Sequence, residues 1–260
     1  MNIFGGLMNR IDRIEYAVVC DRGLHRDKNQ DNFWCAGTYL ASENAGLTQP
    51  LAGTAASKDF PVFAVFDGMG GETDGEKAAW LAACTFDGCA ASRETRAGTA
   101  FLADACLRMN DAICDYAVKC HIRRIGTTAA ILLASQSAVQ ICNLGDSRIF
   151  LHRKGRLEQL SEDHVANRSI GGKPPLTQFL GIPLSEFRIE PHQAKIKCRP
   201  GDRYLLCSDG LTDMVPEEKI ASILSSETAA LPAATALLEK ALDAGGRDNI
   251  TVILCDAVKA

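Results

Sequence analysis

The chain has 260 residues, of which 47% are hydrophobic and 23% charged, so it is long enough to bury one sizeable core. Its formal net charge of −4 gives no general attraction to nucleic acid or to anionic lipid. No apolar stretch reaches the roughly 20 residues that a membrane span needs, and residues 1–14 lack the apolar segment of a signal peptide. We therefore expect one domain over residues 1–260, a cytoplasmic monomer without nucleic-acid or membrane partners.

The cysteines indicate a reducing compartment. There are 11 of them, an odd number, scattered among apolar neighbours and without Cys-x-x-Cys pairing. We expect most of them to be small buried side chains. A zinc site built from cysteine and histidine is the alternative, but the paired ligand spacing typical of such sites is missing.

In the first half of the chain, strands are predicted at residues 15–20, 32–36 and 60–66. The period then changes, and apolar residues recur on one helical face over residues 76–91 and 100–118. Residues 41–59 are rich in Gly, Ala, Ser and Thr and are predicted to be a surface loop inserted between two strands. Such a loop is either disordered or in contact with substrate.

The second half begins with closely spaced strand patterns at residues 127–133, 138–144, 148–151, 188–196 and 203–207. Helical patterns follow at 217–224 and 233–244, before a last strand at 249–255. Residues 165–183 contain Gly171-Gly172 and Pro174-Pro175 and are predicted to form a mobile, irregular flap. Short connections favour antiparallel pairing, so we predict an α+β fold, an antiparallel β-sandwich of two sheets flanked by helices in four layers (α-β-β-α).

Several aspartates lie at the ends of these strands or in turns beside them: Asp31, Asp67, Asp146, Asp209, Asp213 and Asp248. Any one of them is most simply a turn or cap residue, because Asp-Gly is common turn chemistry. As a set they can converge on one rim of the sandwich, where their repulsion is costly unless divalent cations neutralise it. Ligation by oxygen alone favours Mg²⁺ or Mn²⁺ over zinc.

These residues give the chain a resemblance to the PPM-type (type 2C) metal-dependent serine/threonine protein phosphatases, in their bacterial branch. The matching segments follow one another in order over nearly the whole chain: Arg26 with Asn29-Gln30-Asp31, Val65-Phe66-Asp67-Gly68-Met69-Gly70-Gly71, Gly126-Thr127-Thr128, Asn143-Leu144-Gly145-Asp146-Ser147-Arg148, Leu160-Ser161-Glu162-Asp163-His164, Cys207-Ser208-Asp209-Gly210-Leu211 and Gly246-Arg247-Asp248-Asn249. The resemblance implies the same β-sandwich flanked by helices.

The resemblance also implies a site with two Mn²⁺ or Mg²⁺ ions, and a weaker third ion in some members. It makes Asp67 the carboxylate that bridges two ions and places the Gly68 carbonyl on one of them. The resemblance further implies that Asp209 and Asp248 bind the ions directly, that Asp31 holds a metal-bound water, and that a third ion binds at Asp146, Asp209 and Asp213. Arg26 is implied to bind the substrate phosphate, for which a forked and permanently charged guanidinium is well suited.

The implied activity is hydrolysis of phosphoserine and phosphothreonine in proteins by a water that bridges the two metals, opposing a cognate serine/threonine kinase. Two positions depart from the wider family. Gln30 stands where some members carry glutamate, and Met69 stands where many eukaryotic members carry a histidine proposed to protonate the leaving alcohol. Since methionine donates no proton, water is the expected source; His164 is the other candidate, although a loop histidine is more often merely solvated.

Two alternatives of other classes remain open at this point. One is a catalytically inactive relative that serves as a binding or sensor module, which would be expected to lack one of the aspartates, and none is missing. The other is a metal-dependent phosphoesterase for a small metabolite, because the phosphate and metal contacts would be shared.

Overall fold

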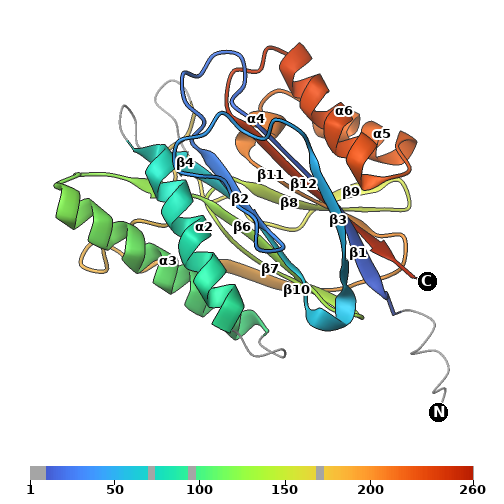
Figure 1. The fold of residues 1–260 in the computed structure, drawn as a ribbon, viewed down its shortest axis with the longest axis horizontal. Helices are drawn as coiled ribbons and strands as arrows, with labels where there is room; N and C mark the ends of the chain where they lie inside the picture. The colour runs from blue at the N-terminus through green and yellow to red at the C-terminus, as the bar shows by residue number, and fades with distance from the viewer. Residues whose placement is uncertain (1–9, 70–73, 93–97, 168–172, 260) are drawn as a thin grey trace.

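The computed structural model describes residues 10–69, 74–92, 98–167 and 173–259 of the chain. Two antiparallel sheets pack face to face, and helices cover the outer face of each (Figure 1). This is the four-layer α-β-β-α arrangement that the sequence predicts. Within the described residues, no helix is long and apolar enough to cross a membrane.

The first sheet contains the first and the last strand and has the order β3 (Leu51–Ala56), β1 (Arg13–Asp21), β12 (Ile250–Val258), β11 (Arg203–Cys207), β8 (Arg148–Arg153) and β9 (Arg156–Gln159). The second sheet has the order β10 (His192–Lys197), β7 (Ala138–Leu144), β6 (Ala129–Ala134), β4 (Val62–Met69) and β2 (Asp31–Cys35), with β5 (Gly126–Thr127) paired to the end of β4.

Helices α2 (Gly75–Ser92) and α3 (Thr99–Cys120) lie on the second sheet, whereas α5 (Glu217–Ser226) and α6 (Ala230–Asp243) lie on the first (Figure 1). A short α4 (Asp209–Thr212) follows β11, and a 3-10 helix, η1 (Ser57–Asp59), follows β3.

The central strands contribute to the core on both of their faces, because successive side chains of a strand point to opposite sides of the sheet. In β4, Phe63 and Val65 belong to the cluster between the two sheets, whereas Ala64 and Phe66 pack beneath α2 and α3 with Phe86. Burial on both faces explains why this strand is a continuous apolar run. Burial on both faces also fixes the register of β4 in the sheet, and therefore the position of the residues at its end.

The predicted loop over residues 41–59 is wrong in its second half. Residues 51–56 form the edge strand β3, paired antiparallel with β1, and η1 follows directly. One of the small residues that suggested a loop has a packing reason: Gly53 lies opposite Tyr16, and a Cβ there would collide with the phenol group. The pairing of β3 with β1 has therefore outweighed the low strand propensity of its small residues.

Strand β4 runs further than predicted. It does not end at Phe66 but continues through Asp67 and Gly68 to Met69, because β5 pairs with this extension and places Thr127 opposite Gly68. Glycine is required at position 68, since a Cβ would collide with the Gly75 carbonyl at the start of α2. Asp67 therefore sits inside a paired strand rather than in a turn.

Smaller differences occur elsewhere. The strand predicted at 188–196 begins only at His192, while β9 and α4 were not predicted. In the predicted flap over 165–183, residues 168–172 lie outside the described residues, as do Gly70 and Gly71. The rest of the flap is held by backbone hydrogen bonds, from Ala166 N–H to the Pro175 carbonyl (2.9 Å) and from Thr177 N–H to the His164 carbonyl (2.8 Å). All cysteines are free, and most of them are buried.

Candidate metal centre

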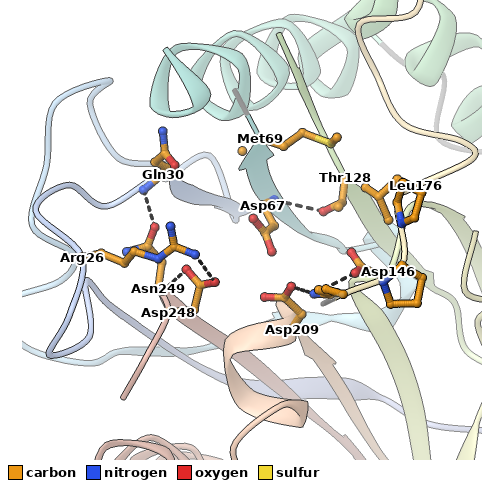
Figure 2. A pocket seen from close by; sticks show the side chains of 14 residues that line it. Arg26, Gln30, Asp67, Met69, Thr128, Asp146, Leu176, Asp209, Asp248 and Asn249 are labelled. Atoms are coloured by element: carbon orange, nitrogen blue, oxygen red, sulfur yellow. Dashed lines mark hydrogen bonds and ion pairs between the residues drawn. The ribbon is translucent and has the colours of Figure 1, made fainter. Parts of the chain in front are cut away.

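A pocket of about 330 Å³ opens at one end of the sandwich. Figure 2 shows four carboxylates around it that come from different parts of the chain: Asp67, Asp146, Asp209 and Asp248. Other lining residues include Arg26, Gln30, Gly68, Met69, Thr128, Lys173 and Asn249. The structure therefore brings together most of the predicted site residues, which lie up to 222 positions apart in sequence.

Asp67 is fixed in place by the threonines of the neighbouring strand. Its N–H donates to Thr128 Oγ1 (3.0 Å), while Thr127 Oγ1 and the Thr128 N–H donate to its carbonyl (both 2.9 Å). The Gly126-Thr127-Thr128 segment thus serves as a structural support for the site. Burial, followed by the charges of Asp31, Asp146 and Asp248, raises the pKa of Asp67 well above its ordinary value. Positive charge brought into this pocket would be strongly favoured.

Asp31 lies next to Asp67, as its register partner across β2 and β4. It is only 2% exposed. One carboxylate oxygen, Oδ2, accepts from Ser208 Oγ and Thr251 Oγ1 (both 2.7 Å). The other, Oδ1, is buried and has no hydrogen-bond partner in the part of the chain that the structure describes. Burial raises the pKa of Asp31 to about 7. A buried carboxylate oxygen without a donor is a group that a bound water or cation would satisfy.

Three carboxylates surround one lysine on the other side of the pocket. The Lys173 ammonium, from the predicted flap, pairs with Asp209, with Asp146 (Nζ to Oδ2, 2.9 Å) and with Asp213 (3.5 Å). Burial lowers the pKa of Lys173, but the surrounding carboxylates outweigh this and raise it overall. The Lys173 ammonium thus lies among the three aspartates that the family resemblance assigns to a third metal ion.

Arg26 lies at the outer rim, where its Nη2 donates to Asp248 Oδ2 (2.7 Å) and about half of its side chain is exposed. Asn249 helps to position both members of this ion pair. Its N–H donates to Asp248 Oδ1 (2.9 Å). Its Nδ2 donates to the carbonyls of Arg22 and Lys28, which lie on either side of Arg26 in the sequence. Sequence reasoning gave Asn249 no role of its own. Two signals could have indicated one: it directly follows a predicted ligand, and it lies in the matching segment Gly246-Arg247-Asp248-Asn249.

Gln30, which replaces a glutamate of some relatives, is linked to another carboxylate. Its Nε2 donates to Glu76 Oε2 (3.1 Å), and Glu76 also pairs with Lys28. Met69 lines the pocket and offers no proton. His164 is not a lining residue, and its Nδ1 accepts from the Gly145 N–H (3.2 Å). The structure therefore gives no support to His164 as a substitute acid.

The donor set fits hard divalent cations, since every candidate ligand is an oxygen atom and one of them is buried without a partner. As placed, no three His, Cys, Asp or Glu side chains of the described residues lie close enough to ligate one ion. Lys173 and Arg26 are paired with the carboxylates instead. A divalent ion would therefore have to displace these two cationic groups.

Comparison with known proteins identifies relatives over most of the chain. A family model described as "Protein phosphatase 2C" matches residues 50–244. The serine/threonine protein phosphatase PstP of Mycobacterium tuberculosis is 30% identical over 259 residues, covering 94% of this chain but only 45% of the relative. The serine/threonine phosphatase stp of Listeria monocytogenes is 32% identical over 257 residues, covering 91% of this chain and 93% of the relative.

Among solved structures, the catalytic domain of PstP in complex with two manganese ions aligns with a TM-score of 0.76. The two sequences are 29% identical, and the alignment covers 95% of the present chain and 100% of the PstP chain in that structure. The present chain thus spans less than half the length of the M. tuberculosis relatives and nearly all of the Listeria relative.

Proposed function

This chain belongs to the protein phosphatase 2C (PPM) family, and on that premise we propose that it hydrolyses phosphoserine and phosphothreonine in proteins with the help of two Mn²⁺ or Mg²⁺ ions. One observation carries the proposal. Asp67, Asp209 and Asp248, scattered along the sequence, line one pocket with an arginine at its rim, and Asp31 is buried next to Asp67. An inactive module would have no need to keep all of these carboxylates together.

The residues that would hold the two ions are those that the family resemblance assigns and that line the pocket. Asp67 would ligate both ions, and Asp209, Asp248 and the Gly68 carbonyl would complete the set. The free oxygen of Asp31 would bind a water of the cluster. Asp146, Asp209 and Asp213 would hold a third ion in place of Lys173. When bound, such ions activate water and neutralise phosphate charge.

Arg26 supplies the chain's own recognition of the phosphate. In the present structure its guanidinium is half exposed and engages Asp248 by a single nitrogen. It can therefore offer forked donors to two phosphate oxygens and hold the phosphorus in line with the attacking water. Since Met69 cannot donate a proton, the leaving alcohol receives its proton from solvent.

The expected partners are phosphorylated proteins and a serine/threonine kinase whose action this phosphatase opposes. The relatives in Mycobacterium and Listeria carry serine/threonine phosphatase names, which supports this class of substrate. The monomeric state and the cytoplasmic location remain predictions.

Hydrolysis assays test the proposed activity directly. The purified protein is expected to hydrolyse both a small aryl phosphate and a phosphothreonine peptide when Mn²⁺ or Mg²⁺ is present, and to lose both activities in excess chelator. Restoring Mn²⁺ should restore them, because the ions supply the activated water. Vigorous turnover in excess chelator would exclude the metal-dependent mechanism.

Arg26→Ala is expected to weaken substrate binding. A hydrogen bond to a charged group contributes about 1.5–3 kcal/mol, so KM for a phosphothreonine peptide should rise roughly 10- to 150-fold. Arg22→Ala is the matched control, because Arg22 lies in the same loop, is exposed and does not line the pocket. Steady-state kinetics of the two variants check the assignment, and an unchanged KM for the Arg26 variant would refute it.

A further inference from the structure

A second and larger cavity, of about 820 Å³, lies beside the metal pocket. We call it the flanking groove. One wall is the C-terminal end of α3 with residues 121–125, and the other consists of residues 175–187, from the second half of the flap and the segment directly after it. Met69, Pro175 and Leu176 line both the flanking groove and the metal pocket. A polypeptide whose phosphorylated residue enters the metal pocket can therefore extend directly into the groove.

The groove is formed before any ligand binds, because backbone hydrogen bonds order both of its walls. Helix α3 ends with His121 in the left-handed conformation, and the Ile122 N–H donates to the Ala117 carbonyl (2.9 Å). On the other wall, Leu180 exchanges two backbone hydrogen bonds with Thr127 (2.9 and 3.0 Å). A preformed groove binds an extended peptide without a further ordering cost in the protein.

A buried amide secures the flap wall most firmly. Asn110 of α3, which is 1% exposed, accepts from the N–H groups of Gly181 (2.9 Å) and Ile182 (3.1 Å) and donates to the Ile182 carbonyl (3.0 Å). Three hydrogen bonds from one buried side chain fix this part of the flap to α3. The groove thus has a fixed width where it passes Ile182.

The lining combines apolar surface with unpaired positive charge. Val118 and Phe187 are 75% and 50% exposed, which is unusual for large apolar side chains next to a site. Arg123 and Arg124 are exposed, and neither forms an ion pair with another described residue. Glu186 is the one acidic residue among the described residues that line the groove.

We propose that the flanking groove binds the stretch of substrate polypeptide next to the phosphorylated residue, and that Arg123 and Arg124 select substrates with acidic residues in that stretch. The proposal rests on the proposed phosphatase function and adds a substrate class to it. Two adjacent arginines that form no ion pair with the described residues, on a chain whose net charge is −4, present a local field that favours carboxylates. The exposed apolar residues beside them favour a peptide that also carries an apolar side chain.

The test compares three phosphothreonine peptides that differ only in their flanking residues, which are acidic, neutral or basic, with a small aryl phosphate as reference. Wild-type protein is expected to show a higher kcat/KM for the acidic peptide. Two exposed ion pairs contribute modestly, so the preference over the neutral peptide should be about fivefold. The variant R123A/R124A should lose this preference while its kcat/KM for the aryl phosphate stays unchanged, because that substrate does not reach the groove.

Charge reversal gives the sharper result. The variant R123E/R124E is expected to prefer the basic peptide over the acidic one, which a merely structural role of the arginines would not produce. Arg156→Ala, an exposed arginine on β9 away from the groove, is the matched control and should retain the wild-type preference. Equal kcat/KM values for all three peptides in wild type and variants would overturn the groove assignment and leave the phosphatase function standing. Failure of wild type on every phosphorylated compound would instead overturn the function.

Discussion

Asp67→Asn is expected to lower the turnover of a phosphothreonine peptide by roughly 10³-fold or more, because an amide cannot bridge two divalent ions and the charge that holds them is lost. The substitution keeps the shape of the side chain and the backbone hydrogen bonds to Thr127 and Thr128. The variant should therefore fold normally.

The stability of this variant gives a second readout with a definite sign. In chelator, the melting temperature of Asp67→Asn should equal or exceed that of wild type, since the pKa of Asp67 is raised by burial and by neighbouring carboxylates, and a neutral group relieves both. Added Mn²⁺ should raise the melting temperature of wild type much more than that of the variant. Asp243→Asn, at an exposed position in α6, is the control. If Asp67→Asn hydrolysed the peptide at the wild-type rate, the role of Asp67 as a ligand of the catalytic metal ions would be refuted.

Arg203→Met is expected to cause the largest loss of stability, about 3–5 kcal/mol, because it breaks a buried ion pair by removing one partner. The Arg203 side chain is 8% exposed and contacts Asp256 on β12 with two nitrogens (2.6 and 2.8 Å). It also donates to the carbonyls of Leu224 (3.0 Å) and Glu227 (2.7 Å) at the end of α5. One side chain therefore joins two strands to a helix.

Denaturant unfolding at equilibrium measures this loss. The double variant R203M/D256L should be less destabilised than R203M, since replacing both charges leaves no buried carboxylate unpaired. The turnover of folded R203M at low temperature should match that of wild type, because Arg203 starts β11 whereas Asp209 follows its other end. A loss of stability below 1 kcal/mol would show that the ion pair is not a major contributor.

The elements with strong periodicity could be predicted from the sequence. Strands β4, β7 and β11 and helices α2 and α3 have residue patterns that their burial on the sandwich explains. Strand β3 could not, because its small residues have a loop-like composition, and its pairing with β1, which places Gly53 opposite the Tyr16 ring, is a tertiary contact. The pairing of β5 with β4, which moved Asp67 from a turn into a strand, is a tertiary contact without a local signal.

The candidate site was predictable as a set of aspartates but not as a network. The motifs around Asp67, Asp209 and Asp248 identify the acidic residues, and the structure places them at one pocket. Nothing local to Lys173 indicates that it pairs with carboxylates as far away as Asp146 and Asp213. The unpartnered oxygen of Asp31 likewise depends on burial that only the folded chain creates.

Anomalous diffraction from crystals of the wild-type protein grown with Mn²⁺ tests most directly whether these carboxylates are gathered to bind divalent ions. We expect two manganese peaks that both contact Asp67, with Asp209 and Asp248 among their other ligands and with Lys173 moved away from Asp209. Crystals of active protein that show no manganese at this pocket, with Lys173 and Arg26 still paired to the aspartates, would contradict it.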